Sequence, residues 1–188
     1  VILDAKRADI GNTNNGYVEA AFDFLRVDAI TVHPYLGAEA LQPFLARAEK
    51  GVIVLCRTSN PGAGEFQDLL VPNPIAGCDI SMVGEDSGPV LAPTTIPLYQ
   101  RVAHNVARDW NKNGNCALVV GATYPDELRE VRGLVGDMPI LIPGIGAQGG
   151  DVEKTVTAGK DSHGQGMIVN SSRGIIFASK GADFAEAA

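Results

Sequence analysis

The sequence has little of several features that define common classes of protein. Aromatic residues make up 6% of its 188 residues, with a single tryptophan, while 45% are hydrophobic, an ordinary share for a globular chain. No apolar run approaches the roughly 20 residues that a membrane-spanning helix needs, and no secretory leader is visible. We therefore expect no membrane partner.

Basic residues are also few. Fifteen Lys and Arg face 22 Asp and Glu, which gives a formal net charge of −7. This balance argues against nucleic acid or an anionic membrane as a partner, since both select basic surfaces. An anionic ligand would need a local basic site.

Cysteine and metal-binding patterns are equally sparse. Cys56, Cys78 and Cys116 are odd in number and widely spaced, which favours reduced thiols and a cytoplasmic protein over a disulfide framework. No H-x-x-x-H, C-x-x-C or Walker sequence occurs, and the three histidines are scattered. We expect no metal site. Cys56 follows a strand but has no evident general base, so a buried thiol is expected there.

What the sequence does have is an alternation of short β-branched runs and amphipathic stretches. The expected strands are followed by polar or glycine-rich turns, as in a parallel sheet buried on both faces. They are Val1–Leu3, Ala29–Val32, Gly51–Leu55, Ala117–Val120, Ile140–Ile142 and Met167–Val169. The expected helices are Asn14–Leu25, Gly37–Arg47, Leu98–Lys112, Pro125–Val135 and Asp151–Ala158.

This order predicts an α/β fold, for which an open doubly wound sheet and a (β/α)₈ barrel are the candidates. Polar residues follow all six strands, whereas an open sheet gathers its ligand contacts at one switch point. Both chain ends look cut. We therefore expect one partial (β/α)₈ TIM barrel domain over residues 1–188, with six βα units present and the first two missing.

One segment breaks the rhythm. Residues 70–97 carry five prolines and little periodicity, which excludes a regular helix or a central strand. We interpret the segment as a surface insertion or loop, in preference to a lid over the site.

The most informative stretch is "LDAKRADIG", which places Asp4, Lys6 and Asp9 beside an apolar strand. Residues i and i+2 of a strand face the same side, so Asp4 and Lys6 should point together into the barrel mouth. A self-satisfied ion pair is the structural alternative. Charges at the carboxyl end of a barrel strand favour function.

These residues carry a family resemblance. "DAKRADIGNT" resembles the Asp-x-Lys-x-x-Asp-Ile signature of orotidine 5′-phosphate decarboxylases, particularly the longer bacterial-type enzymes. "DAITVHPYLG", "VLCRTSNPGAGEFQD", "LVVGATYPDEL", "PGIGAQGGD" and "NSSRGIIFAS" resemble further blocks of that family, in the same order. The resemblance covers nearly the whole chain apart from the proline-rich segment.

The resemblance implies decarboxylation of orotidine 5′-phosphate to UMP, the last step of de novo pyrimidine synthesis, without metal or organic cofactor. It implies a homodimer and a Lys-Asp-Lys-Asp array, whose last three members match Asp4, Lys6 and Asp9. Lys6 would be the proton donor to C6. Asp9 and Thr13 would serve the neighbouring subunit's site.

The same resemblance assigns substrate-binding residues. Ser59 matches a serine that hydrogen-bonds the pyrimidine, Asn60 belongs to the same loop, and Ile10 would lie near the base. Gly146 and Gly149 lie in a glycine-rich turn before a helix that Asp151 could cap, where backbone N–H groups can bind an anion. Gln148 and Arg173 match phosphate contacts, and an arginine suits a bidentate grip on phosphate.

Two alternatives stay open. Sister phosphosugar barrels share Asp-x-Lys-x-x-Asp but use magnesium, although "TSNPGAG" and "NSSRG" favour the nucleotide enzyme. A non-catalytic module that binds a phosphorylated ligand is the other. The resemblance places the array's first Lys and another Asp of the family on the two missing strands, so we expect the chain alone to be inactive or unstable, and a longer parent to be competent.

Overall fold

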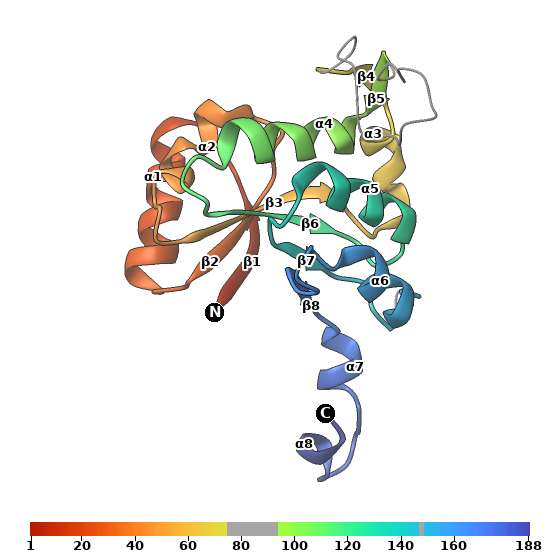
Figure 1. Cartoon of the computed structure of the whole chain (residues 1–188). Helices are drawn as coiled ribbons and strands as arrows, with labels where there is room; N and C mark the ends of the chain where they lie inside the picture. Colours follow the sequence, from red (N-terminus) through yellow and green to blue (C-terminus); the bar gives the residue numbers. More distant parts are fainter. Residues whose placement is uncertain (75–93, 147–148) are drawn as a thin grey trace, which may run out of the picture.

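A computed structural model of the chain describes residues 1–74, 94–146 and 149–188. Its centre is a curled sheet of six parallel strands in the order β1-β2-β3-β6-β7-β8 (Figure 1). The strands are β1 (Ile2–Arg7), β2 (Ala29–Val32), β3 (Gly51–Arg57), β6 (Cys116–Val120), β7 (Ile140–Ile142) and β8 (Met167–Val169). The six βα units form a partial (β/α)₈ barrel, as the sequence predicts.

Helices cover the outer face of this sheet (Figure 1). They are α1 (Gly11–Val18), α2 (Gly37–Leu45), α4 (Leu98–Asn105), α5 (Pro125–Val135) and α6 (Val152–Gly159). Two short helices, α7 (Ser172–Ile176) and α8 (Phe184–Ala187), follow β8 and project away from the sheet. The molecule therefore has a helix-covered face and a face that the long helices leave open.

Strand residues alternate between these two faces. Val52 and Val54 of β3 lie in the larger core under the helices, together with Leu118 of β6. Their neighbours Ile53 and Val119 belong to a smaller cluster on the opposite, concave face. Both sets are buried, which explains why the strands read as continuous apolar runs.

The largest difference from the expected elements lies around the first helix. It begins at Gly11, three residues before the expected start, and continues as wider π-helical turns over Glu19–Phe24. The helix expected over Leu98–Lys112 likewise ends in π-helical turns at Val106–Trp110. Apolar periodicity fixes the buried face of a helix but not the hydrogen-bond step within it.

The ends of the proline-rich segment form a small separate sheet. β4 (Leu70–Pro72) and β5 (Thr95–Pro97) pair antiparallel beside the short helix α3 (Gly64–Gln67). Neither strand joins the central sheet, as its prolines predict. Residues 75–93 lie outside the described ranges, so the interpretation of 70–97 as an insertion stays a prediction.

The amino-terminal ends of the strands are tied together by a buried and a partly buried polar side chain. Arg132 of α5 donates to the carbonyl oxygens of Gly136, Met138, Gly159 and Gly166 at 2.6–2.9 Å. Asn115 donates to the carbonyls of Leu45, Arg47 and Lys50. These bonds satisfy carbonyl groups at helix ends and strand starts.

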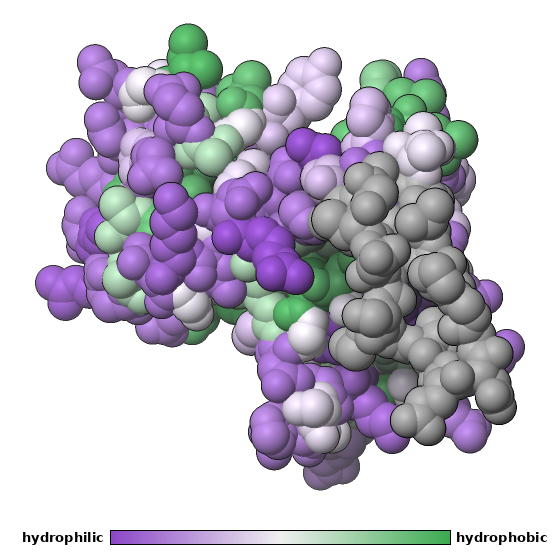
Figure 2. All heavy atoms as spheres, turned by 45° about the horizontal axis from the view of Figure 1, so that its top comes forward, coloured by the Kyte–Doolittle hydropathy of each residue, from purple (hydrophilic) through white to green (hydrophobic). Residues whose placement is uncertain are grey.

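The outer surface is mixed in character. Figure 2 shows hydrophilic residues over most of the visible face, with apolar residues in several separate places. Within the described ranges, no helix is both long and apolar enough to cross a bilayer.

Candidate active site

A cavity of about 720 Å³ opens on the concave face, at the carboxyl ends of the strands. Its floor is apolar and comes from Ile2, Leu55, Val119, Leu141 and Ile168. Its polar lining comes from β1 and from the segments after β3 and β8, and comprises Asp4, Lys6, Thr58, Ser59, Asn60, Gln67, Asn170 and Ser172. An apolar floor with a few convergent polar groups is the usual form of a small-ligand site.

Asp4 and Lys6 face each other at this cavity, as strand periodicity predicts. The Lys6 ammonium donates to both oxygens of Asp4, at 2.7 and 2.8 Å. Thr31 of β2 is fully buried beneath them, where its hydroxyl donates to Asp4 and its oxygen accepts from the Lys6 backbone N–H. The neighbouring strand therefore holds both members of the pair.

The backbone at Lys6 is strained. Its φ angle is +49°, a left-handed conformation that non-glycine residues rarely adopt. The parallel register between β1 and β2 is irregular between Leu3 and Arg7, so Lys6 sits on a bulge. Bulges and positive φ angles of this kind redirect side chains and concentrate at functional sites.

The Asp4 carboxylate is held in its charged form. Partial burial raises the pKa of Asp4, but hydrogen bonds from Lys6 and Thr31 and the Lys6 charge outweigh it, so the pKa lies below its usual value. Both side chains of the pair are more than half exposed, so they remain open to the cavity. The site thus offers an anion and a cation side by side.

The loop after β3 adds Ser59 and Asn60 to the cavity lining. Gly121, which follows β6, permits this approach, because a Cβ at Gly121 would come within 2.7 Å of Ser59 Cβ and 2.9 Å of its Cα. The Gly121 N–H also donates to the Arg57 carbonyl at 2.8 Å. A side chain at position 121 would push the loop out of the cavity.

Asp9 and Ile10 lie in the turn between β1 and α1, and Thr13 lies in the first turn of α1; all three are outside the cavity lining. Ile10 is 65% exposed and Thr13 is also exposed. The fully buried Asn14 fixes the turn, because its oxygen accepts from the Asp9 N–H at 2.8 Å and its NH₂ donates to the Asp9 and Ala40 carbonyls. The structure therefore separates Asp9 from the Asp4–Lys6 pair.

The glycine-rich turn after β7 leads into α6 as expected. Gly146 and Gly149 have φ angles of +76° and +89°, and the Gly149 N–H donates to the Gly146 carbonyl at 2.7 Å. Asp151 caps α6 by accepting from the Lys154 N–H at 2.9 Å. Gln148 lies outside the described residues.

Arg173 lies in the first turn of α7, with its side chain exposed. It does not line the cavity, although Asn170 and Ser172 beside it do. The Ser171 hydroxyl donates to the Ile145 carbonyl at 3.3 Å and so links this segment to the glycine-rich turn. The two expected phosphate loops are therefore neighbours.

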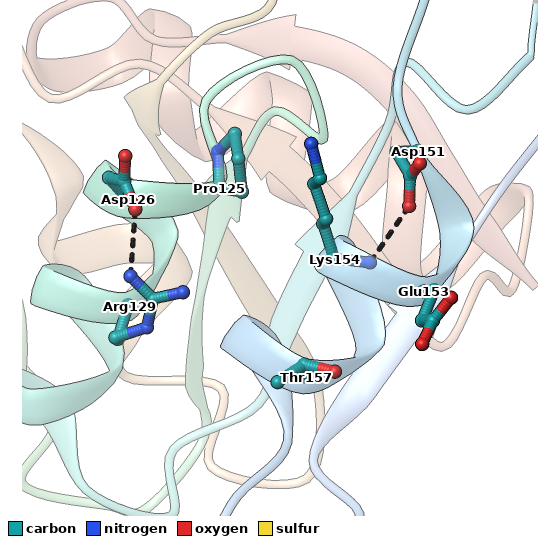
Figure 3. A pocket seen from close by; sticks show the side chains of 7 residues that line it. All are labelled: Pro125, Asp126, Arg129, Asp151, Glu153, Lys154 and Thr157. Carbon is teal, nitrogen blue, oxygen red and sulfur yellow. Dashed lines mark hydrogen bonds and ion pairs between the residues drawn. The ribbon is translucent and has the colours of Figure 1, made fainter.

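A second cavity, of about 520 Å³, lies between the first turns of α5 and α6 (Figure 3). Arg129 pairs with Asp126 at 2.7 Å, and the Lys154 side chain lies between Pro125 and Asp151. Glu153 and Thr157 complete the lining. Its charges are exposed and largely matched, so we place the chemistry in the larger cavity.

The cysteines behave as buried thiols where the structure describes them. Cys56 and Cys116 are free and buried, and desolvation raises their pKa values to about 12 and about 11. A thiol with such a pKa is protonated at neutral pH and makes a poor nucleophile. Cys78 lies outside the described residues.

Sequence reasoning missed Thr31, Asn14, Arg57 and Gln67. Thr31 carries the clearest signal, since it is a polar residue inside the apolar run Ala29–Val32. The other three act through long-range hydrogen bonds that no local pattern encodes. Arg57 is buried with its guanidinium 4.0 Å from the Tyr124 ring centre and 3.3 Å from Gln67 and Asp68 oxygens.

The fold and site define a class: a parallel (β/α) barrel protein with an acid–lysine pair at the carboxyl end of a strand. Comparison with known proteins narrows it. A family model described as "Orotidine 5'-phosphate decarboxylase / HUMPS family" matches residues 1–83. Orotidine 5′-phosphate decarboxylases of Azoarcus sp. and Janthinobacterium sp. are 53% and 51% identical over all 188 residues, which cover 62% and 61% of those proteins.

Solved structures agree with these relatives. The structure of Leishmania donovani OMP decarboxylase matches with a TM-score of 0.79 and 38% identity, over 100% of this chain and 63% of that one. The chain is similar to orotidine 5′-phosphate decarboxylases over its whole length. It spans about three fifths of the length of the curated relatives it matches.

Proposed function

We propose that this chain carries the active site of an orotidine 5′-phosphate decarboxylase, which converts orotidine 5′-phosphate to UMP and CO₂ in the cytoplasm. The observation that carries the proposal is the Asp4–Lys6 pair, held by Thr31 at a bulge of β1 and open to the cavity. The names of the relatives support the reaction.

In the proposed reaction the bond between C6 and the carboxylate breaks, and CO₂ leaves without its bonding electrons. The electron pair stays at C6 as a vinylic carbanion with little delocalisation. The Lys6 ammonium stabilises this charge and then gives its proton to C6, so the step needs neither metal nor cofactor. Asp4 would lie beside the substrate carboxylate. There it would hold the Lys6 side chain in place and raise the free energy of the bound substrate.

The Lys6 charge alone is too weak to account for catalysis. Opposite charges about 4 Å apart interact by about 4 kcal/mol at an effective dielectric near 20. Enzymes lower barriers by about 8–23 kcal/mol, so most of the effect must come from preorganisation and from binding energy at remote groups.

The proposed remote group is the phosphate. Gly146 and Gly149 adopt positive φ angles in the turn ahead of α6, and Ser171 ties that turn to the segment carrying Arg173. We propose that Gln148 and Arg173 bind the phosphate, while Ser59 and Asn60 contact the pyrimidine. Ile10 would lie near the base.

We also propose a homodimer in which Asp9 and Thr13 serve the partner's site. The exposure of Thr13 and the position of Asp9 outside the cavity support a role beyond this subunit. Within each subunit, residues 1–188 would form one partial barrel domain with an insertion at 70–97.

Calorimetric titration of the chain with UMP and with ribose 5-phosphate tests the ligand. UMP should bind more tightly, because Ser59 and Asn60 add base contacts to those of the phosphate. Equal affinity would favour a module that recognises phosphate alone.

Turnover tests the reaction. The array's first Lys and the family's other Asp are not matched in this sequence, so we expect little UMP formation by the chain alone. Turnover should appear once the chain is joined to the segments of the Azoarcus sp. relative that it does not cover.

In that joined protein, Lys6→Ala should abolish UMP formation and retain UMP binding. EDTA should leave turnover unchanged. Loss of activity with EDTA would favour the magnesium-dependent phosphosugar barrels instead.

A further inference from the structure

The loop after β3 contains a chain of hydrogen bonds whose direction is fixed at one end. Gln67 Oε1 accepts from the Thr58 backbone N–H at 2.9 Å and from Arg57 Nη1 at 3.3 Å. A backbone N–H and a guanidinium can only donate. The Gln67 amide therefore has one permitted orientation, with its NH₂ group on the other side.

This orientation determines those of the next two side chains. Gln67 Nε2 donates to Thr58 Oγ1 at 2.9 Å, so the Thr58 hydroxyl proton must point elsewhere. It points to Asn60 Oδ1, 2.7 Å away. Asn60 must therefore accept through its oxygen, which leaves its NH₂ group on the side of Gly62, 3.8 Å from the ideal position of a Cβ there.

Asn60 and Gln67 both line the cavity of the proposed active site. Among residues 1–74, 94–146 and 149–188, no group accepts a hydrogen bond from Asn60 Nδ2. This NH₂ group is therefore available to a ligand.

We propose that Gln67 and Thr58 are positioning residues that make Asn60 a hydrogen-bond donor, so that the loop selects a pyrimidine with a carbonyl at C4. The inference rests on the proposed function, which places Lys6 at C6 of the ring. Asn60 lies in the loop after β3, whereas Lys6 lies on β1, and we place the Asn60 NH₂ group at C4 of the base. Uracil has a C4 carbonyl that accepts, next to an N3–H that donates, whereas cytosine has a C4 amino group that donates, next to an N3 that accepts. An NH₂ group that faces C4 therefore selects uracil.

Gln67→Glu separates this role from a merely structural one. The introduced carboxylate has nearly the same shape as the amide and keeps the contacts with the Thr58 N–H and Arg57, but both of its oxygens accept. The Thr58 hydroxyl would then donate to this carboxylate and accept from Asn60. The Asn60 amide would turn over and present its oxygen to the ligand.

The first measurement is the ratio of UMP to CMP affinity by calorimetry. We expect the wild-type chain to prefer UMP by about tenfold, the value of one hydrogen bond to a correctly placed partner. In Gln67→Glu the ratio should fall by at least about tenfold. The added negative charge should weaken the binding of UMP and CMP alike, because both carry the same phosphate. This effect therefore cancels in the ratio of their affinities.

Two further variants complete the design. Gln42→Glu adds the same charge on the exposed side of α2 and should leave the ratio unchanged. Thr58→Val removes the hydroxyl relay while keeping the side-chain shape, so the ratio should approach one without inverting. An unchanged ratio in both Gln67→Glu and Thr58→Val would overturn the proposal.

Nuclear Overhauser contacts test the orientation without ligand. In the wild type, the Asn60 side-chain NH₂ should contact the Gly62 α-protons, and in Gln67→Glu it should contact Thr58 instead. Identical contacts in both chains would overturn the relay. If the Asn60 amide turns over in Gln67→Glu but the wild-type chain binds neither UMP nor CMP, the hydrogen-bond relay is supported and the proposed function is contradicted.

Discussion

Two buried arginines, Arg57 at the end of β3 and Arg132 in α5, differ in how they are paired at the two ends of the sheet. Arg132, 9% exposed at the amino-terminal end, donates to four backbone carbonyls. Arg57, 3% exposed at the carboxyl end, makes two longer side-chain contacts of 3.3 Å, and its Nε has no hydrogen-bond partner among the described residues. Burying an unpaired donor costs free energy.

The contrast separates stability from recognition. Barrel proteins place binding residues at the carboxyl ends of strands and depend on the opposite end for stability. Arg132 is paired entirely with the backbone of its own fold. Arg57 instead orients Gln67, which faces the cavity, so its imperfect pairing lies next to the proposed ligand site.

The largest stability effect is expected for Arg132→Met. The substitution removes the side-chain donor of the Gly136, Met138 and Gly159 carbonyls in a region where water has little access, while the Gly166 carbonyl still accepts from the Ile140 N–H. We expect the free energy of unfolding in urea to fall by about 3–5 kcal/mol. UMP affinity of the folded variant should stay unchanged, and a loss of affinity would remove the contrast between the two ends.

Asn14→Ala should have the next largest effect. It leaves the N–H and carbonyl of Asp9 without their side-chain partner near the barrel mouth and removes the link from this turn to the Ala40 carbonyl of α2. Urea unfolding should show a loss of about 2–3 kcal/mol. Exchange of the Asp9 amide proton should accelerate in the folded state. Unaltered exchange would mean that Asn14 does not hold this turn.

Arg57→Met should have the opposite effect to Arg132→Met: a small loss of stability and a loss of UMP affinity. It removes an already unsatisfied buried donor together with the ring contact to Tyr124, so the stability loss should be only about 1–2 kcal/mol. UMP affinity should fall, because Gln67 loses one of the two donors that orient it. Wild-type UMP affinity together with a large loss of stability would mean that Arg57, like Arg132, serves stability and not recognition.

These variants also mark how far sequence reasoning reaches. Apolar runs and the turns after them locate all six strands, because buried parallel strands require that composition whatever their neighbours are. The i, i+2 spacing pairs Asp4 with Lys6 correctly. The strand expected over Val1–Leu3 is shorter than β1, which extends to Arg7, because the charged residues at the end of β1 do not match the apolar pattern of a buried strand.

The residues that hold the site could not be found in this way. Asn14 sits in the polar run "GNTNNG" and Gln67 in "GEFQD", where exposure is the ordinary expectation for either residue. Their partners are Ala40, 26 residues away, and Thr58, nine residues away, and no periodicity links such positions. Only the folded chain brings these donors and acceptors together.

The smallest expected effect concerns the pH dependence of Asp4. Its pKa is lower in the folded chain than the usual value of 3.8, so the folded state favours the charged carboxylate. The contribution to stability is therefore present above about pH 4 and disappears as the pH falls through the lower folded pKa. Asp4 is mostly exposed, which limits the contribution to less than about 1 kcal/mol. Urea unfolding of wild type and Asp4→Asn should differ slightly at pH 7 and converge in acid. A larger difference at low pH than at pH 7 would mean that the Lys6 and Thr31 contacts do not hold the carboxylate charged.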